Sequence, residues 1–158
     1  MIDVYTDGSC PRNSKAGARP GGWAFAYELE GGLVTRSGAV PDTTNNRMEM
    51  RAVLEALRHF KREWPKLPAI TVYSDSQYVV NGLNLWGEKW QRFGWKRLDY
   101  HRKWQPISND DLWKKLYPLF HDEIGAKIKW VRGHRGTRLN EVCDELAGRA
   151  VWDLIEHQ

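Results

Sequence analysis

Four acidic side chains stand where an acid is unusual: Asp7, Glu49, Asp75 and Asp144. Asp7 and Asp75 end the strand-like segments "IDVYT" and "ITVYS", whereas Glu49 and Asp144 head apolar stripes with helical spacing. In a fold of strands and helices these ends can meet at one edge of the sheet. Converging carboxylates repel each other, so they need either raised pKa values or a bound cation.

The chemistry that such a cluster supports is metal-assisted. Ligation by oxygen alone selects hard cations, so we expect magnesium, with manganese as a substitute, rather than zinc. Two such ions roughly 3.5–4 Å apart activate a water and stabilise the leaving oxygen during phosphodiester cleavage. The pattern therefore predicts a metal-dependent phosphodiester hydrolase, as a hypothesis about side chains that are distant in sequence.

Each acid also has an ordinary structural explanation. Asp7 precedes a glycine in a common turn pair, and Glu49 follows Asn46 at the spacing of a capping box. Asp75 lies in a Ser-Asp-Ser junction that could cap a helix, and Asp144 could stabilise a helix dipole. Taken one at a time, these alternatives stay open. Together they leave unexplained why two acids end strands and two others head the inner faces of helices.

The surrounding pattern indicates the elements that would position these acids. The expected strands are 2–6, 22–29, 33–40, 69–75 and 126–131. The expected helices are 45–64, 76–83, 108–124 and 138–156. The expected helix caps are Asn45, Asn46, Ser76, Ser108 and Asn109. Three strands joined by turns, followed by strands that alternate with helices, predict an α/β fold with a mixed sheet.

Composition limits the function classes. The 158 residues suit one domain, expected over 1–158, and 41% hydrophobic with 28% charged residues is ordinary for a globular protein. No apolar run reaches the roughly 18 residues of a membrane span, and the N-terminus lacks the pattern of a signal peptide, so we expect a cytoplasmic protein. Cys10 and Cys143 are expected to be free thiols. The formal charge of +4 permits an anionic partner.

Residues 86–104, here called the protrusion, have an unusual composition. They hold four of the nine tryptophans, with six basic residues against two acidic ones. Cations beside aromatic faces suit a nucleic-acid backbone. The alternative is that the tryptophans pack in the core while the charges are merely solvated. We expect both: some of the tryptophans pack at the base of this segment, while its basic edge binds DNA.

Seven segments together resemble the type 1 ribonucleases H, which cut the RNA strand of RNA–DNA hybrids. The segments are "YTDGSC" (5–10), "TTNNRMEMRAVLEAL" (43–57), "TVYSDSQYVVNG" (71–82), "WGEKWQRFGWK" (86–96), "NDDLW" (109–113), "WVRGH" (130–134) and "NEVCDELA" (140–147). The resemblance implies a ribonuclease H-like fold: a five-stranded mixed sheet, its first three strands antiparallel, with helices packed on both faces.

The resemblance also implies roles for individual residues. Asp7, Glu49, Asp75 and Asp144 match the family's catalytic, metal-binding acids, and His134 matches a histidine that assists proton transfer or product release. Without the family, His134 would be read as a plain loop residue. Two magnesium ions are expected with substrate bound.

Substrate contacts follow from the same resemblance. Short polar side chains can read the 2′-hydroxyls of RNA, and the matching positions are Cys10, Asn13, Asn45, Asn46 and Gln77. Thr44 and Asn109 match positions that hold a phosphate of the DNA strand, although Asp42 stands nearby where some relatives have arginine. In the protrusion, Trp90, Trp95 and Lys96 are the expected contacts. The alternatives are helix caps for Asn45 and Asn46, and a turn for Asn13.

The implied activity is that of an endonuclease that hydrolyses the RNA strand of RNA–DNA hybrids with a metal-activated water, leaving 5′-phosphate and 3′-hydroxyl ends. A monomer that binds hybrids and no membrane is expected. Three rival readings are a transposase or junction resolvase with the same fold, a module that binds hybrids without cutting, and a basic α/β domain that binds proteins.

Overall fold

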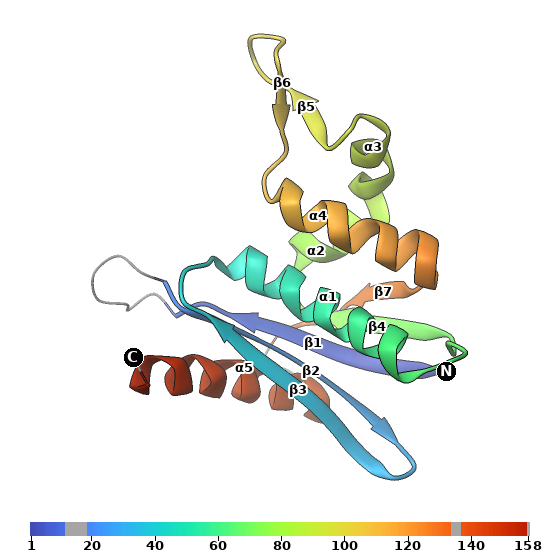
Figure 1. Ribbon diagram of the computed structural model, residues 1–158, viewed down its shortest axis with the longest axis vertical. Coiled ribbons are helices and arrows are strands. Elements are labelled where there is room, and N and C mark those ends of the chain that lie inside the picture. Colours follow the sequence, from blue (N-terminus) through green and yellow to red (C-terminus); the bar gives the residue numbers. More distant parts are fainter. Residues whose placement is uncertain (12–18, 134–136, 158) are drawn as a thin grey trace.

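A five-stranded mixed sheet organises the computed structural model, which describes residues 1–11, 19–133 and 137–157. The strands lie in the order β3 (Gly32–Val40), β2 (Gly21–Leu29), β1 (Ile2–Ser9), β4 (Ile70–Ser74) and β7 (Lys127–Trp130). The pairs β1–β2 and β2–β3 are antiparallel, whereas β1–β4 and β4–β7 are parallel (Figure 1). The predicted α/β mixed sheet is thus confirmed.

Two long helices cover the two faces of the sheet. Helix α1 (Asn45–Glu63) packs on β1 and β2, and α5 (Arg138–Glu156) packs across β1, β2 and β3 from the other side (Figure 1). The expected bounds of these helices, 45–64 and 138–156, agree with the structure to within a residue. None of the helices formed by described residues is both long and apolar enough to cross a bilayer.

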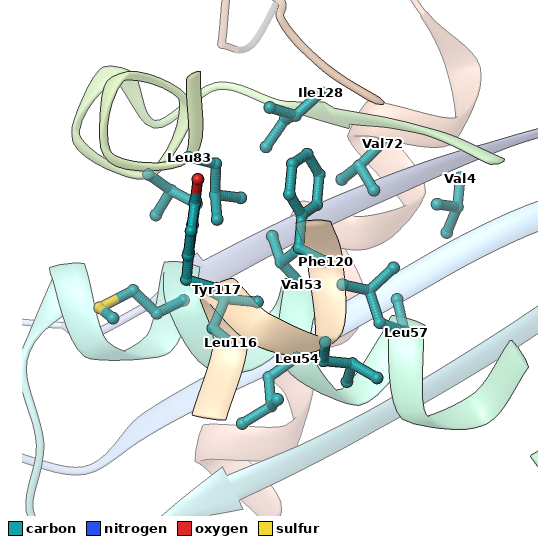
Figure 2. Close-up of a cluster of buried hydrophobic side chains, with 14 of the residues drawn as sticks. Val4, Val53, Leu54, Leu57, Val72, Leu83, Leu116, Tyr117, Phe120 and Ile128 are labelled. Atoms are coloured by element: carbon teal, nitrogen blue, oxygen red, sulfur yellow. The ribbon is translucent and has the colours of Figure 1, made fainter. Parts of the chain in front are cut away.

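The main core lies on the α1 side of the sheet. The inner face of α1 buries Val53 and Leu57 against Val4 of β1 and Val72 of β4 (Figure 2). Their apolar positions recur with helical spacing in α1 and alternate in the strands, which explains why these segments form these elements. Burial of each such side chain contributes about 1.5–3 kcal/mol.

The α5 side is packed by small residues, and the phase of α5 differs from the prediction. Cys143, Ala147 and Val151 point inward and are buried, whereas Asp144 is exposed. The placement of Asp144 on the core-facing stripe is therefore wrong by one residue. The close fit depends on Gly22 of β2, where a Cβ would lie 2.1 Å from the carbonyl oxygen of Ala147.

The helical segment after β4 is longer than predicted. Instead of ending at residue 83, it continues as α2 (Gln77–Asn81), the π-helix η2 (Gly82–Trp86) and α3 (Gly87–Arg92). Two glycines within this segment serve close packing. A Cβ at Gly82 would lie 2.1 Å from the ring of Trp113, and one at Gly87 would lie 2.4 Å from the ring of Tyr117.

The second half of the protrusion, together with the two residues that follow it, forms a two-stranded antiparallel sheet that the sequence did not predict. Strands β5 (Lys96–Leu98) and β6 (Trp104–Pro106) rise beyond the main sheet beside α3 (Figure 1). All six strand residues are exposed, so they show no alternation of buried and exposed positions from which a strand could be inferred.

The predicted helix 108–124 is divided. Helix α4 (Asp110–Tyr117) changes into the π-helix η3 (Pro118–Ile124) at Pro118, which has no N–H to continue the regular ladder. Gly125 ends η3 with a left-handed φ of 68°. Cys10 and Cys143 are both buried free thiols, as expected.

Candidate active site

Two of the four acids come from neighbouring parallel strands. Thr6 of β1 pairs with Ser74 of β4, so the following residues, Asp7 and Asp75, reach the same edge of the sheet. Strand β1 continues to Ser9, and Asp7 pairs with Ala24 of β2 inside the ladder. Asp7 is therefore a strand residue, which removes the turn as an explanation for an acid at this position.

Glu49 reaches the same edge from α1. The first turn of α1 is capped by Thr44, whose Oγ1 accepts a hydrogen bond from the Arg47 N–H at 3.2 Å. The predicted caps Asn45 and Asn46 are wrong, because α1 begins at Asn45, one residue after its cap. Glu49 consequently belongs to no capping box, and its carboxylate accepts a hydrogen bond from the Gly8 N–H instead.

Gly8 allows this close approach of β1 and α1. A Cβ at Gly8 would lie 2.4 Å from both the backbone N of Glu49 and the carbonyl carbon of Met48. The Gly8 N–H also donates to Asp7 Oδ1 at 2.9 Å. A residue without a side chain is thus what brings the two carboxylates together.

Helix capping does not explain Asp75 either. Ser76 caps α2, because its Oγ accepts a hydrogen bond from the Val79 N–H at 3.2 Å. Carboxylate oxygens of Asp7, Glu49 and Asp75 lie within 4.8 Å of one another. Gly133 lies against this cluster, since a Cβ there would be 2.8 Å from Asp75 Oδ2.

Asp144 completes the arrangement from α5. It lines an open hollow of about 430 Å³ together with Asp7, Glu49 and Asp75. The four acids thus reach one hollow from four elements, although Asp144 stands on the exposed side of its helix. Cys10 and Asn45 also line this hollow.

The environment of the hollow disfavours the ionised form of the two buried carboxyl groups, Asp7 and Glu49. The pKa of Asp7 is raised to about 7, mainly by burial and also by the charges of Asp75 and Asp144, whereas its hydrogen bonds with Glu49 and Gly8 act in the opposite direction. Burial, followed by the neighbouring Asp7 and Asp75, raises the pKa of Glu49 well above its usual value. A set of buried carboxylate oxygens that resists ionisation by itself fits a hard divalent cation.

The residues expected to read 2′-hydroxyls are placed differently from one another. Asn45, Asn46 and Gln77 are exposed, and Asn45 lies on the hollow. Cys10 is only 9% exposed, and its thiol approaches the carbonyl oxygens of Thr43 at 3.6 Å and Arg19 at 3.8 Å. Asn13 lies outside the described residues, as does His134.

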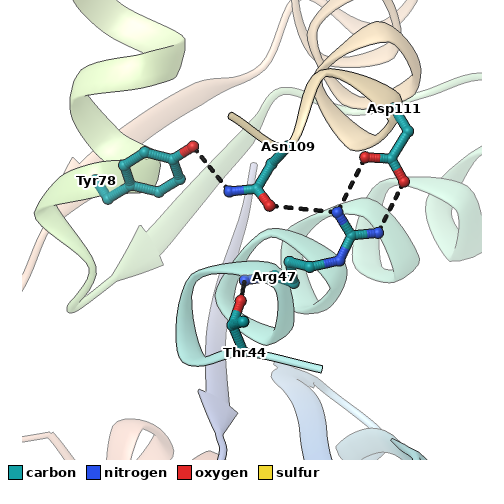
Figure 3. Close-up of polar contacts among 5 residues, drawn as sticks. All are labelled: Thr44, Arg47, Tyr78, Asn109 and Asp111. Carbon is teal, nitrogen blue, oxygen red and sulfur yellow. Dashed lines mark hydrogen bonds and ion pairs between the residues drawn. The ribbon is translucent and has the colours of Figure 1, made fainter. Parts of the chain in front are cut away.

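Thr44 and Asn109, the predicted phosphate contacts, belong to one polar network (Figure 3). Arg47 Nη1 donates to Asn109 Oδ1 at 3.2 Å, and Asn109 Nδ2 donates to the Tyr78 hydroxyl at 3.1 Å. Asp111 holds the other side of the Arg47 guanidinium. Sequence reasoning missed Arg47, Tyr78 and Asp111, although each lies inside a segment that carries the resemblance.

The aromatic residues of the protrusion correct one expectation. Trp95 is 9% exposed and packs edge-on against Tyr117 in the core, so its ring is not a surface contact. Trp90 is half-buried, and Lys96 is exposed. The exposed aromatic residues of the protrusion are Trp86, Phe93, Tyr100 and Trp104.

Comparison with known proteins gives this geometry a family. The RNase H family model matches residues 1–152. The chain belongs to the RNase H family. This RNase H is 42% identical over 155 residues to the Ribonuclease H of Syntrophomonas wolfei subsp. wolfei, covering 97% of each chain. It is 37% identical over 171 aligned positions to the Ribonuclease H of Treponema denticola, covering 98% of this chain and 99% of that one.

Solved structures agree with this RNase H assignment. LC9-RNase H1, a type 1 RNase H with the type 2 active-site motif, superposes with a TM-score of 0.78 at 34% identity, covering 96% of this chain and 72% of its own. LC11-RNase H1, solved in complex with an RNA/DNA hybrid, superposes with a TM-score of 0.67 at 19% identity, covering 98% and 99%. At that identity the likeness concerns the fold. The expected membership in the ribonucleases H is thereby confirmed.

Proposed function

We propose that this RNase H family enzyme hydrolyses the RNA strand of RNA–DNA hybrids at internal positions, leaving 5′-phosphate and 3′-hydroxyl ends. The observation that carries the proposal is the meeting of Asp7, Glu49, Asp75 and Asp144 in one open hollow. Their ordinary roles as turn or capping residues do not account for the first three.

Magnesium is the proposed cofactor, with manganese able to substitute. Asp7, Glu49, Asp75 and Asp144 would hold two ions when substrate is bound. When bound, such ions supply activation of a water and stabilisation of the leaving oxygen's charge. The raised pKa values of Asp7 and Glu49 support a site that awaits a cation.

The backbone positions the first ligands before substrate arrives. Gly8 donates its N–H to both Asp7 and Glu49, which orients the two carboxylates toward the hollow. His134, the proposed carrier of a proton to the leaving oxygen, follows Gly133, whose backbone lies against Asp75. An unperturbed imidazole, with a pKa near 6.5, suits proton transfer in either direction.

The proposed hybrid-binding surface extends outward from the hollow. Asn45, Asn46 and Gln77, together with Cys10 and Asn13, are proposed to read the 2′-hydroxyls of the RNA strand. The exposure of the first three supports this. Thr44 and Asn109 are proposed to hold a phosphate of the DNA strand.

The protrusion is proposed to add contacts through Trp90 and Lys96. We further propose that residues 1–158 act as one catalytic domain, as a monomer, in the cytoplasm.

The decisive experiment supplies labelled RNA–DNA hybrid, duplex DNA and duplex RNA to the purified protein with magnesium. Cleavage of the hybrid's RNA strand alone is expected, with ends that a ligase can rejoin. Chelation of the metal should stop the reaction, and so should Asp75→Asn. Cleavage of duplex DNA without cleavage of the hybrid would contradict the proposal and favour the resolvase reading.

A further inference from the structure

An open groove runs between α3 and the β5–β6 sheet, in the protrusion. It has a volume of about 550 Å³, which is within the roughly 300–1,000 Å³ of small-molecule sites. The groove is hereafter called the aromatic groove. Its lining residues are Trp86, Lys89, Trp90, Phe93, Lys96, Arg97, Leu98 and Trp104.

Large apolar side chains stay exposed around the aromatic groove. Trp86 is 41% exposed, Phe93 44%, Leu98 52% and Trp104 50%. A contiguous patch of this kind marks a binding surface more often than it marks ordinary packing. The alternative that the protrusion's tryptophans pack in the core therefore holds for Trp95 but not for Trp86 and Trp104.

The aromatic groove is already formed without a ligand. Phe93 of the α3 C-cap and Trp104 of β6 stack across it, with ring centroids 5.7 Å apart and planes at 22°. Its base is anchored in the core, where Trp95 and Ile107 are buried and the Ile107 N–H donates to the Trp95 carbonyl at 3.0 Å. Such a rigid stack offers further aromatic faces at little entropic cost.

The charge around the aromatic groove is positive. Lys89, Lys96 and Arg97 line it, and no acidic side chain is among the described residues that do so. The two acids of the protrusion are engaged elsewhere. Glu88 forms an ion pair with Arg92 at 3.1 Å, and Asp99 accepts backbone N–H groups at the tip of the hairpin.

We propose that the aromatic groove binds unpaired nucleotides of a single-stranded nucleic acid. Within a duplex each base is stacked on both of its neighbours, whereas an unpaired base has a free face to add to the Phe93–Trp104 stack. The three cations would hold the phosphates on either side of that base. The single strand would be a tail that continues beyond the hybrid. In this respect the inference rests on the proposed function, which it deepens.

A binding experiment without hybrid or metal tests the aromatic groove independently of catalysis. Fluorescence anisotropy of a labelled oligothymidylate, in EDTA and at low salt, would be measured with the full chain. Trp104→Leu keeps an apolar side chain but removes the aromatic face, so affinity should fall about five-fold or more, as for loss of one base–aromatic stack. Trp104→Phe should retain most of the affinity. Trp152→Leu, at a 63% exposed tryptophan of α5, should change nothing.

A second measurement places the strand. With calcium in place of magnesium, the wild-type protein should bind a hybrid with a single-stranded tail more tightly than a blunt hybrid. Trp104→Leu should abolish this difference while leaving the affinity for the blunt hybrid unchanged.

Several results would overturn the inference. One is that Trp152→Leu lowers the affinity for the oligonucleotide as much as Trp104→Leu does. Another is that Trp104→Leu binds the oligonucleotide like the wild type. A third is that Trp104→Leu lowers the affinity for blunt and tailed hybrids equally. Failure to bind the oligonucleotide, with a dimer in sedimentation that Trp104→Leu dissociates, would show instead that a second copy covers the groove. Failure of hybrid cleavage alone would overturn the proposed function and leave oligonucleotide binding intact.

Discussion

Arg47 and Asp111 form a bidentate ion pair between the first turns of α1 and α4, with N–O distances of 2.9 and 2.7 Å. The hydrogen bonds from Arg47 are the main reason that the pKa of Asp111 falls to about 2. The pair therefore persists at all pH values above about 4 and weakens only as the pH falls toward 2. Because Arg47 also donates to Asn109, the pair positions a proposed phosphate contact.

Asp111→Asn should raise the KM for hybrid a few-fold and leave kcat unchanged, because Asn109 loses its fixed neighbour and neither residue lines the hollow of the four acids. The stability loss should stay below about 1 kcal/mol, since the Asp111 side chain is 59% exposed and solvent screens the pair. Steady-state kinetics and thermal melts check both values. Glu145→Gln, which removes the exposed Arg149–Glu145 pair of α5, is the matched control and should leave KM unchanged. A fall in kcat alone would contradict the positioning role.

Asp7→Asn should lower kcat by about 100-fold or more, the scale for losing one preorganised electrostatic group. The same change should stabilise the metal-free protein above about pH 7, because a neutral amide avoids the cost of burying a charge and also the repulsion from Asp75 and Asp144. One pKa unit corresponds to about 1.4 kcal/mol, so relief of half the shift of Asp7, from 3.8 to about 7, gives roughly 2 kcal/mol. Asp3→Asn, at an exposed acid of the same strand, should change neither quantity. An Asp7→Asn protein with intact turnover would exclude the metal mechanism.

The stability of the metal-free protein should fall as the pH rises. The pKa of Asp7 is raised in the folded state, so its contribution to stability is complete below about pH 4 and is lost as the pH rises through about 7. Melting temperatures in EDTA should fall over that window, and magnesium should reverse the fall because it binds the ionised form. Calorimetry near pH 6.5 should also detect protons released on magnesium binding. Equal slopes with and without magnesium would argue against a metal site at these acids.

The long elements were predictable because their signal is local. Val53 and Phe60 recur on one face of α1, and the strands of the main sheet have a buried face, so hydrophobic periodicity located them. The hairpin β5–β6 was not predictable, because strands that are exposed on both faces carry no such period. The continuation of the helical segment past residue 83 was not predictable either, because Gly82 and Gly87 receive the rings of Trp113 and Tyr117, which come from a later helix.

The candidate site shows the same division between local and tertiary information. Strand ends and helix starts identified the four acids. The phase of Asp144 was nevertheless wrong by one residue, because Cys143 and Asp144 lie four and three positions before Ala147 and either spacing fits one face of a helix. In the network that joins Thr44 to Asn109, the hydrogen bond from Arg47 to Asn109 links residues 62 apart in sequence. No local pattern marks such a contact, since it depends on how α1 and α4 pack.

Gly8→Ala tests the contact that the site depends on most. An alanine Cβ would lie 2.4 Å from the backbone of Glu49 and Met48, and neither β1 nor α1 can move without disturbing the core. We expect a loss of about 1–3 kcal/mol in the free energy of unfolding, as for other overpacked sites. Magnesium affinity should weaken as well, because the first turn of α1 is pushed away from Asp7.

Gly148→Ala is the matched control: a Cβ there meets nothing within 4 Å, so this change in α5 should stabilise the protein by up to about 1 kcal/mol. Denaturant titration and magnesium calorimetry of both variants give the comparison, and a Gly8→Ala protein with wild-type stability and magnesium affinity would show that Glu49 does not rely on this close approach.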